Sequence, residues 1–252
     1  TYEKSVDVAT PTITDINNVF AKIKAYADEK GVPVFVNIGG GEPFLRKDII
    51  VILKSASEHF GSSGVGVDTN GTLDNSFDLI LEALAYVSYV GISINGLEEY
   101  HNWWAGNNKI NAFQRSIEVV KRLCSYVEYA EKIEVTSVAS KWNIAEIPDL
   151  MDLLQRIGVK NYSLHRAMAI GRMARHPELI PDASDYLNLL LAIIERSQTN
   201  GLRVHLHHSI ESIHATLLLG LNTYAPDKIG NPDAGSSLGI EPGGHLVFDP
   251  WC

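Results

Sequence analysis

Short apolar runs alternate with helical patterns along most of the chain, and this alternation limits the possible folds more than any other feature. Five runs are predicted strands: Val34–Ile38, Val65–Val67, Val87–Ile94, Ile133–Val138 and Tyr162–Leu164. Buried parallel strands are near-continuous apolar runs of this kind. Repeated strand–helix units with short connections are typical of a parallel sheet with helices outside it, so the expected fold class is α/β.

The helical patterns lie between and around these runs. They cover Ile13–Glu29, Asp48–Phe60, Phe77–Ala85, Ala112–Tyr126, Ile147–Ile157 and Tyr186–Thr199. In a series of strand–helix units, the helix at Ile13–Glu29 implies a strand ahead of it, outside this chain, which makes six strands before residue 170. Arg203–His207 is a further strand candidate.

The composition changes after Leu221, and residues 231–251 are rich in Gly, Pro, Asp and Ser. Gly243 and Gly244 predict a hairpin turn between Ser237–Ile240 and Leu246–Phe248. We therefore expect a barrel-like domain over residues 1–200 and a small accessory segment over residues 201–252. A length of 252 residues suits one large domain with an appendage, or two modest domains.

Charge, hydropathy and cysteine content argue against several classes of protein. A formal net charge of −9 argues against a general nucleic-acid binder, which needs a basic surface. No apolar run approaches the roughly 20 residues that span a membrane, and residues 1–10 do not form a signal peptide. Two cysteines, Cys124 and Cys252, cannot build a disulfide framework, so the expected location is the cytoplasm.

The segment Ile38–Pro43, with three glycines and Glu42, directly follows a predicted strand. Glycines permit positive φ and let another molecule approach the backbone, and Glu42 stands where barrel folds place ligands. A plain turn with a solvated Glu42 is the alternative. A phosphate-binding loop is disfavoured because no Gly-Lys-Ser/Thr follows.

Five segments together resemble motifs of radical S-adenosylmethionine (SAM) enzymes, in chain order over residues 13 to 175. They are Gly40–Pro43, Asp68–Thr72, Ser93–Gly96 with His101-Asn102, Thr136–Asn143, and Gly171-Arg172. The resemblance implies a partial (β/α)6 TIM-like barrel, SAM and a [4Fe–4S] cluster. It implies reductive cleavage of SAM to a 5′-deoxyadenosyl radical that abstracts a substrate hydrogen, with flavodoxin or ferredoxin as an electron donor.

The resemblance also implies which residues bind SAM, all of them at the carboxyl ends of strands. They are Gly40, Gly41, Glu42, Thr69, Asn70, Ser93, Asn95, Ser137 and Arg166. Glu42 would accept from the ammonium group, while Ser137 and Asn95 would serve hydroxyls or the carboxylate. Capping or turn roles stay open for each, and capping is favoured for Asn143. Arg166 would meet the SAM carboxylate or a surface acid. No catalytic residue is assigned.

The chief departure from the family is the absent C-x3-C-x2-C motif, which supplies the cluster ligands. The helix at Ile13–Glu29 corresponds to the one after that motif, so we expect the three cysteines just upstream of Thr1. A degenerate homologue is the alternative. Cys124 lies in a helical pattern and is expected to be buried rather than a ligand.

The segment from Ala234 to Cys252 resembles the start of a SPASM or twitch auxiliary-cluster module. Cys252 is then a predicted ligand of an auxiliary Fe–S cluster, although Pro232-Asp233 stand where the first cysteine is expected. An ordinary β-hairpin is the alternative.

Relatives with such modules mostly modify peptides, so the first substrate hypothesis is a peptide or protein. A small molecule or cofactor precursor is the second. A barrel hydrolase or lyase that uses Glu42 as base, with His205 and His207 as candidate metal ligands, stays open, and so does a non-catalytic homologue. Trp103 and Trp104 either line a substrate mouth or pack inside. No nucleic acid or membrane partner is expected.

Overall fold

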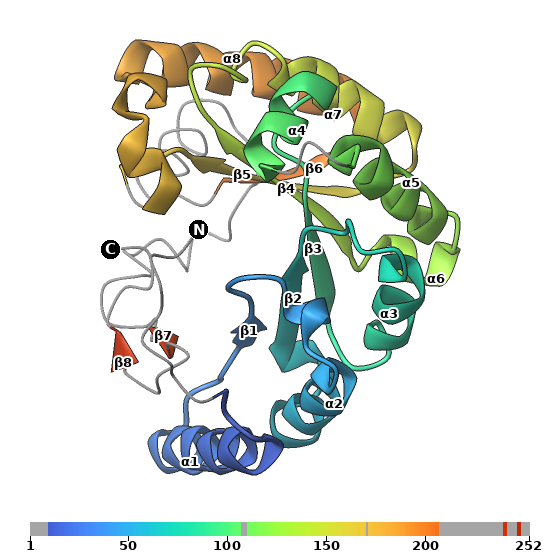
Figure 1. Ribbon diagram of the computed structural model, residues 1–252, viewed down its shortest axis with the longest axis vertical. Coiled ribbons are helices and arrows are strands. Elements are labelled where there is room, and N and C mark those ends of the chain that lie inside the picture. The colour runs from blue at the N-terminus through green and yellow to red at the C-terminus, as the bar shows by residue number, and fades with distance from the viewer. Residues whose placement is uncertain (1–9, 107–109, 170, 207–238, 241–245, 248–252) are drawn as a thin grey trace.

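Six parallel strands form one curved sheet in this computed structural model, which describes residues 10–106, 110–169, 171–206, 239–240 and 246–247 (Figure 1). The strands are β1 (Val36–Ile38), β2 (Val65–Thr69), β3 (Tyr89–Ser93), β4 (Ile133–Ala139), β5 (Asn161–Arg166) and β6 (Arg203–Leu206). Their order in the sheet is their order in the chain, from β1 at one edge to β6 at the other. The fold is therefore an α/β partial barrel, as the sequence predicts.

Helices connect the strands and cover the outer, convex side of the sheet (Figure 1). They are α1 (Ile13–Lys30), α2 (Ile49–Phe60), α3 (Ser76–Ala83), α4 (Glu98–Ala105), α5 (Ala112–Cys124), α6 (Val127–Ala130), α7 (Ile147–Arg156) and α8 (Ala183–Asn200). The described chain also contains four short 3₁₀ helices: η1 (Pro43–Leu45), η2 (Ser62–Gly64), η3 (Gly171–Arg175) and η4 (Pro177–Leu179).

The two longest helices begin and end with local signals that the sequence carries. Thr12 and Asp15 form a capping box at the start of α1, and Asp182 and Asp185 form another at the start of α8. Each box satisfies backbone N–H groups that the first helical turn leaves without partners. None of the helices in the described residues is long and apolar enough to cross a membrane.

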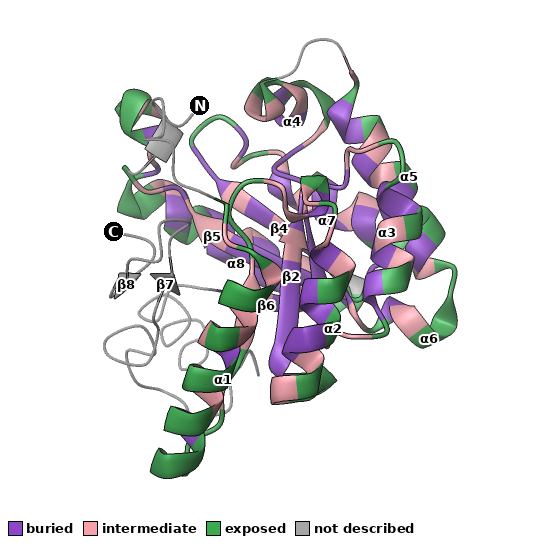
Figure 2. Cartoon of the chain, turned by 60° about the horizontal axis from the view of Figure 1, so that its bottom comes forward, coloured by how far each residue is buried: buried purple, intermediate pink, exposed green. Residues whose placement is uncertain are grey.

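The hydrophobic core lies between the sheet and the helices (Figure 2). Strand β4 shows how the two faces differ. Ile133, Val135 and Ala139 are fully buried in the core, whereas Glu134 and Thr136 alternate with them and are partly exposed. Because successive side chains of a strand point to opposite faces, Glu134 and Thr136 lie on the concave face. The concave face of β4 is thus polar at Glu134 and Thr136 and apolar at Val138.

The five expected strands and the strand candidate that begins at Arg203 are confirmed, with ends that differ by at most two residues. Helices α4 and α6 were not predicted. Strands β7 (Gly239–Ile240) and β8 (Leu246–Val247) pair antiparallel, which confirms the expected hairpin pairing. Three expectations fall outside the described residues: the strand ahead of α1, the metal-ligand candidate His207 and the cluster-ligand candidate Cys252. The domain boundary at residue 200 stays a prediction.

Candidate cofactor site at the carboxyl ends of the strands

The glycine loop after β1 forms one side of the site. Gly40 has a φ of +109°, a conformation that side chains disfavour, and a Cβ added to Gly40 or Gly41 would meet no atom within 4 Å. Both glycines are exposed. The requirement for glycine at Gly40 is therefore conformational, and the loop leaves its backbone open to another molecule.

Glu42 ends this loop and holds two neighbouring segments together. Its Oε1 accepts a hydrogen bond from the Phe44 backbone N–H at 3.1 Å, which caps η1, and another from Thr69 Oγ1 at 2.7 Å. Its Oε2 accepts from the Asn70 backbone N–H at 2.8 Å. An ionised carboxylate has about four acceptor positions, so these three bonds leave about one for a ligand.

The turn after β2 is fixed by its own side chains. Thr69 Oγ1 accepts from the Gly71 N–H at 3.1 Å, and Asn70 Oδ1 accepts from the Thr72 N–H at 2.9 Å. Ser116 on α5 donates to the Asn70 carbonyl at 2.8 Å. Thr69 is buried, whereas Asn70 stays half-buried at the strand end. Thr69 therefore positions Glu42, and Asn70 is the residue of the pair that reaches the mouth.

Ser93 and Asn95 lie at and just after the end of β3, but they differ in their surroundings. Ser93, the last residue of β3, is half-exposed. Asn95 is buried, and its Oδ1 accepts from the Val138 N–H at 2.8 Å. Its own N–H donates to His101 Nδ1 at 3.1 Å. Asn95 thus ties the β3–α4 loop to β4, and Ser93 is left as the open side chain.

Ser137 lies on the helix side of β4, with no exposed surface, and its hydroxyl donates to the Ile94 carbonyl. Asn143 is also buried: its Oδ1 accepts from the Ser140 N–H at 2.6 Å, and its Nδ2 donates to the Val138 carbonyl at 2.9 Å. The capping role expected for Asn143 is wrong, because α7 begins at Ile147 with Glu146 as its N-cap. Both residues brace loops of the mouth.

Arg166 ends β5, and its guanidinium lies 5.8 Å from the centre of the Tyr186 ring on α8. The last position of β5 places the backbone of Arg166 at the same edge of the sheet as Ser93 and Asn70, since the carboxyl ends of parallel strands meet there. Arg166 pairs in register with the buried Ala139, however, so its side chain leaves the helix side of the sheet and lies against α8. The structure thus brings Glu42, Asn70 and Ser93 to one mouth of the partial barrel, with Arg166 at the outer side of the same edge.

Three loops of this mouth also share an aromatic cluster, of which the sequence indicates Trp103 alone. Trp103 on α4 lies 4.7 Å from Trp142 and 5.6 Å from His176, between ring centres. The two tryptophans are 37% and 40% exposed. They therefore pack against each other and still present ring surface at the rim. Trp142 and His176 carry no sequence signal beyond their place after strands β4 and β5.

The family profile described as the Radical SAM superfamily matches residues 7–154, which is more than half of the chain. The chain belongs to the radical SAM superfamily. Its fold agrees: SuiB of Streptococcus suis bound to S-adenosylmethionine aligns at a TM-score of 0.71 and 17% identity, over 98% of this chain and 55% of that chain. The AdoMet-bound protein anSMEcpe aligns at a TM-score of 0.57 and 16% identity, over 88% and 62%.

Two curated relatives of this radical SAM chain differ in what their names say they make. Fe-coproporphyrin III synthase of Methanosarcina barkeri is 30% identical over 144 residues, which cover 56% of this chain and 34% of that protein. PqqA peptide cyclase of Methylorubrum extorquens is 27% identical over 155 residues, or 59% and 38%. The chain therefore spans just over a third of the length of these relatives.

Membership of this family implies SAM and a [4Fe–4S] cluster as cofactors. The described residues fit SAM, because the open glycine backbone and the remaining acceptor position of Glu42 suit an amino acid headgroup. They do not fit the cluster. Cys124 is the one cysteine among them, and burial raises its pKa to about 11, so it is a thiol at neutral pH rather than a thiolate ligand. No group of three or more metal ligands occurs in the described chain.

Proposed function

We propose that this chain is the SAM-binding part of an enzyme that acts on a peptide or protein. The carboxylate of Glu42 carries the proposal: three hydrogen bonds hold it beside an open glycine backbone, with an acceptor position left for the SAM ammonium group. Bound SAM would supply a 5′-deoxyadenosyl radical that abstracts a hydrogen from the substrate. The residues of the chain orient SAM and shield it from water.

We assign the other site residues by how exposed they are and by whether their polar atoms already form hydrogen bonds within the chain. Gly40 and Gly41 offer backbone groups to the SAM headgroup, while Asn70 and Ser93 offer side chains to its carboxylate and ribose hydroxyls. Thr69, Asn95 and Ser137 act indirectly, because their polar atoms hold the loops that carry Glu42 and Ser93. Arg166 stands at the carboxyl end of β5, from where its guanidinium would supply positive charge for the SAM carboxylate if it turned away from Tyr186.

A peptide substrate is supported by the relatives. PqqA peptide cyclase is a curated relative, and SuiB bound to its precursor peptide SuiA aligns at a TM-score of 0.65 and 17% identity, over 92% of this chain and 52% of that chain. The proposal extends to a SPASM-like accessory segment at residues 201–252, with Cys252 as an auxiliary-cluster ligand. It also includes a cytoplasmic location and flavodoxin or ferredoxin as the electron donor.

A small-molecule or cofactor-precursor substrate is the second candidate. Fe-coproporphyrin III synthase is 30% identical to this chain, slightly more than the peptide cyclase, and pre-heme d1 synthase of Dinoroseobacter shibae is 26% identical over 141 residues. Two further possibilities have less support. A hydrolytic metal site would need His205, which instead contacts Glu134, and a non-catalytic homologue would lack cysteines upstream of Thr1.

The experiment uses the full-length gene product, purified without oxygen and reconstituted with iron and sulfide. About four irons per chain indicate the SAM cluster alone, and about eight or more indicate an auxiliary cluster as well. Incubation with SAM and dithionite should release 5′-deoxyadenosine. The absence of cluster and of 5′-deoxyadenosine would refute the enzyme proposal.

The substrate class is tested next by mass spectrometry. Short peptides encoded beside the gene are co-expressed with the protein, and in parallel the reconstituted protein is incubated with iron coproporphyrin. A mass change in a peptide, absent with the Glu42→Ala variant, supports the first candidate. A change in the porphyrin alone would replace it with the second.

A further inference from the structure

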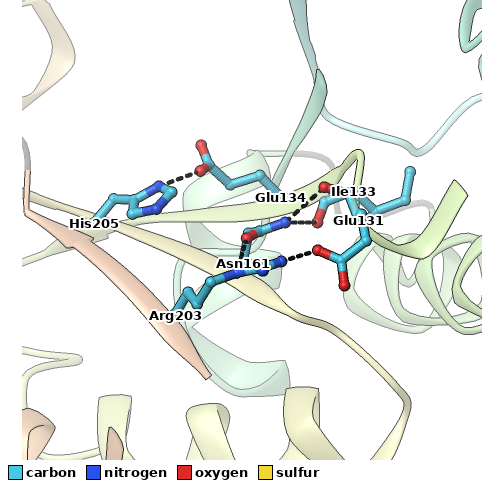
Figure 3. A network of polar contacts seen from close by, with 6 residues as sticks. All are labelled: Glu131, Ile133, Glu134, Asn161, Arg203 and His205. Atoms are coloured by element: carbon cyan, nitrogen blue, oxygen red, sulfur yellow. Dashed lines mark hydrogen bonds and ion pairs between the residues drawn. The ribbon is translucent and has the colours of Figure 1, made fainter. Parts of the chain in front are cut away.

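His205 on β6 and Glu134 on β4 form a pair in which His205 Nδ1 lies 2.8 Å from Glu134 Oε2 (Figure 3). The two residues are 71 positions apart in the chain, and strand β5 runs between their strands. The glutamate is the more enclosed member, with a side chain 14% exposed, against 41% for the histidine. The pair is therefore anchored at the glutamate and open at the imidazole.

Both residues lie on the concave face of the partial barrel. The neighbours of His205 along β6, Val204 and Leu206, belong to the buried core. Glu134 likewise stands between the core residues Ile133 and Val135. Because side chains alternate across a strand, the side chains of His205 and Glu134 project away from the helices and into the barrel.

Strand register places His205 level with the SAM mouth. Ser93 pairs with Thr136, Thr136 with Ser163, and Ser163 with His205, so one cross-strand row joins the proposed SAM contact Ser93 to His205. Three strand spacings of about 4.8 Å separate the ends of this row by roughly 14 Å. A substrate that lies beside SAM inside the barrel is within reach of the imidazole.

Ser163 leaves space for the pair because its side chain is small. It lies between β4 and β6 in the row, it is fully buried, and its hydroxyl has no hydrogen-bond partner among the described residues. A larger residue there would stand between Glu134 and His205.

The contact with Glu134 selects the tautomer of His205. A carboxylate oxygen at this position accepts the Nδ1–H, and whenever the imidazole is neutral this arrangement leaves the lone pair on Nε2. No described residue bonds to Nε2. A carboxylate behind an imidazole stabilises the imidazolium that forms when Nε2 takes up a proton.

The neighbouring ion pair, between Arg203 and Glu131, differs because other residues already satisfy its polar groups. Arg203 donates to Glu131, and its Nε donates to Asn161 Oδ1 at 2.9 Å, while Asn161 Nδ2 donates to the Glu131 carbonyl at 2.9 Å (Figure 3). These groups satisfy one another at the amino-terminal ends of the strands. Glu131 is therefore a matched control for Glu134: it is a carboxylate of the same network that does not touch His205.

We propose that His205, oriented by Glu134, is a proton acceptor for the substrate inside the barrel, a role that rests on the proposed function. The substrate is a peptide with an amine, hydroxyl or thiol near the carbon that loses hydrogen. In the step, the X–H bond of that group breaks and its electron pair stays on X. An Nε2–H bond forms, and the imidazolium faces the carboxylate of Glu134.

The first test needs no substrate. The full-length protein is labelled with 15N-histidine, and two-bond 1H–15N spectra report the tautomer, with His205→Gln assigning the signal. The Nδ1–H form is expected in the protein and in Glu131→Ala, and its loss in Glu134→Ala, which removes the acceptor. An Nε2–H form in the unmodified protein, or no change in Glu134→Ala, would overturn the proposal.

Diethyl pyrocarbonate, which reacts with unprotonated imidazole nitrogen, gives a second readout. Peptide mapping should show modification of His205 and none of His101, whose side chain is buried. Lack of reaction at His205, alongside reaction at the half-exposed His176, would count against an open Nε2.

The last test uses the peptide identified by co-expression. His205→Gly should lower product formation about 100-fold or more, the usual size of a general-base effect, and raise the ratio of 5′-deoxyadenosine to modified peptide. Added imidazole should restore part of the rate, and Glu131→Gln should resemble the unmodified enzyme. An unchanged ratio of 5′-deoxyadenosine to modified peptide in His205→Gly would overturn the proposed role of His205 as proton acceptor. Absence of 5′-deoxyadenosine from the unmodified enzyme would instead refute the proposed function, since SAM cleavage needs no proton acceptor.

Discussion

Thr69 Oγ1 donates a hydrogen bond of 2.7 Å to Glu42 Oε1 and so joins the ends of two neighbouring strands at the proposed SAM site. The same hydroxyl accepts from the Gly71 N–H at 3.1 Å. Glu42 is therefore not a solvated turn residue. Its carboxylate is fixed before any ligand arrives, which lowers the entropy lost on binding.

Glu42→Ala should weaken SAM binding by the full-length, reconstituted protein about 10- to 150-fold. The change removes a charge-assisted hydrogen bond to the ammonium group, worth about 1.5–3 kcal/mol. Isothermal titration calorimetry measures the affinity, and Glu58→Ala on the exposed side of α2 is the control. Equal affinities for the two variants would show that Glu42 does not contact SAM.

Thr69→Val should lower the free energy of unfolding by about 1–3 kcal/mol. Valine keeps the shape of threonine, but it removes the donor to Glu42 and leaves the Gly71 N–H without its acceptor in a buried turn. Equilibrium unfolding in guanidinium chloride measures the change. Thr199→Val, at an exposed position near the end of α8, should cost less. Equal losses would mean that the hydroxyl of Thr69 is not a stabilising contact.

His101 should make the protein less stable in acid. Burial lowers the pKa of His101 to about 4, against about 6.5 in the unfolded chain, so the unfolded state binds the extra proton between these values. Stability from the neutral imidazole is complete above pH 6.5 and is lost as the pH falls toward 4. The loss is at most about 3.5 kcal/mol, at about 1.4 kcal/mol per pH unit.

The measurement compares the free energy of unfolding of the protein and of His101→Asn at pH 7, 6, 5 and 4. Asparagine can still accept from the Asn95 N–H but does not titrate. The difference between the two curves should shrink as the pH falls. Parallel curves would contradict the assigned pKa.

Cys124 should resist alkylation in the folded protein. Burial raises the pKa of its thiol from 9.0 to about 11, which lowers the thiolate fraction at pH 8 about 100-fold. Iodoacetamide labelling followed by peptide mapping compares the native and urea-unfolded protein at that residue. Similar rates in the two states would show that the thiol is accessible and ionises normally.

Strand order and the position of the site could be predicted from the sequence, because apolar runs and the glycine loop are local patterns. The side of the sheet on which each side chain lies could not be predicted. Ser137 stands at a strand end like Ser93, but the two-residue period of a strand turns its hydroxyl toward the helices. Predicting that difference requires the register of β4 against β3, which no local pattern contains.

Other misses have similar causes. Helix α4 carries Tyr100, Trp103 and Trp104 without a clear apolar period, so it was not predicted. The sequence indicates His205 only as a candidate metal ligand, because its partner Glu134 lies 71 residues away and on a different strand. Such a contact emerges from the parallel pairing of three strands rather than from sequence spacing.

The sheet order β1 to β6, identical to the chain order, has a consequence for how the domain assembles during synthesis. Each strand joins the one made just before it, and no strand has to enter between two that are already paired. The sheet can therefore grow from one edge as the polypeptide leaves the ribosome, with every newly made strand–helix unit covering the exposed edge of the last.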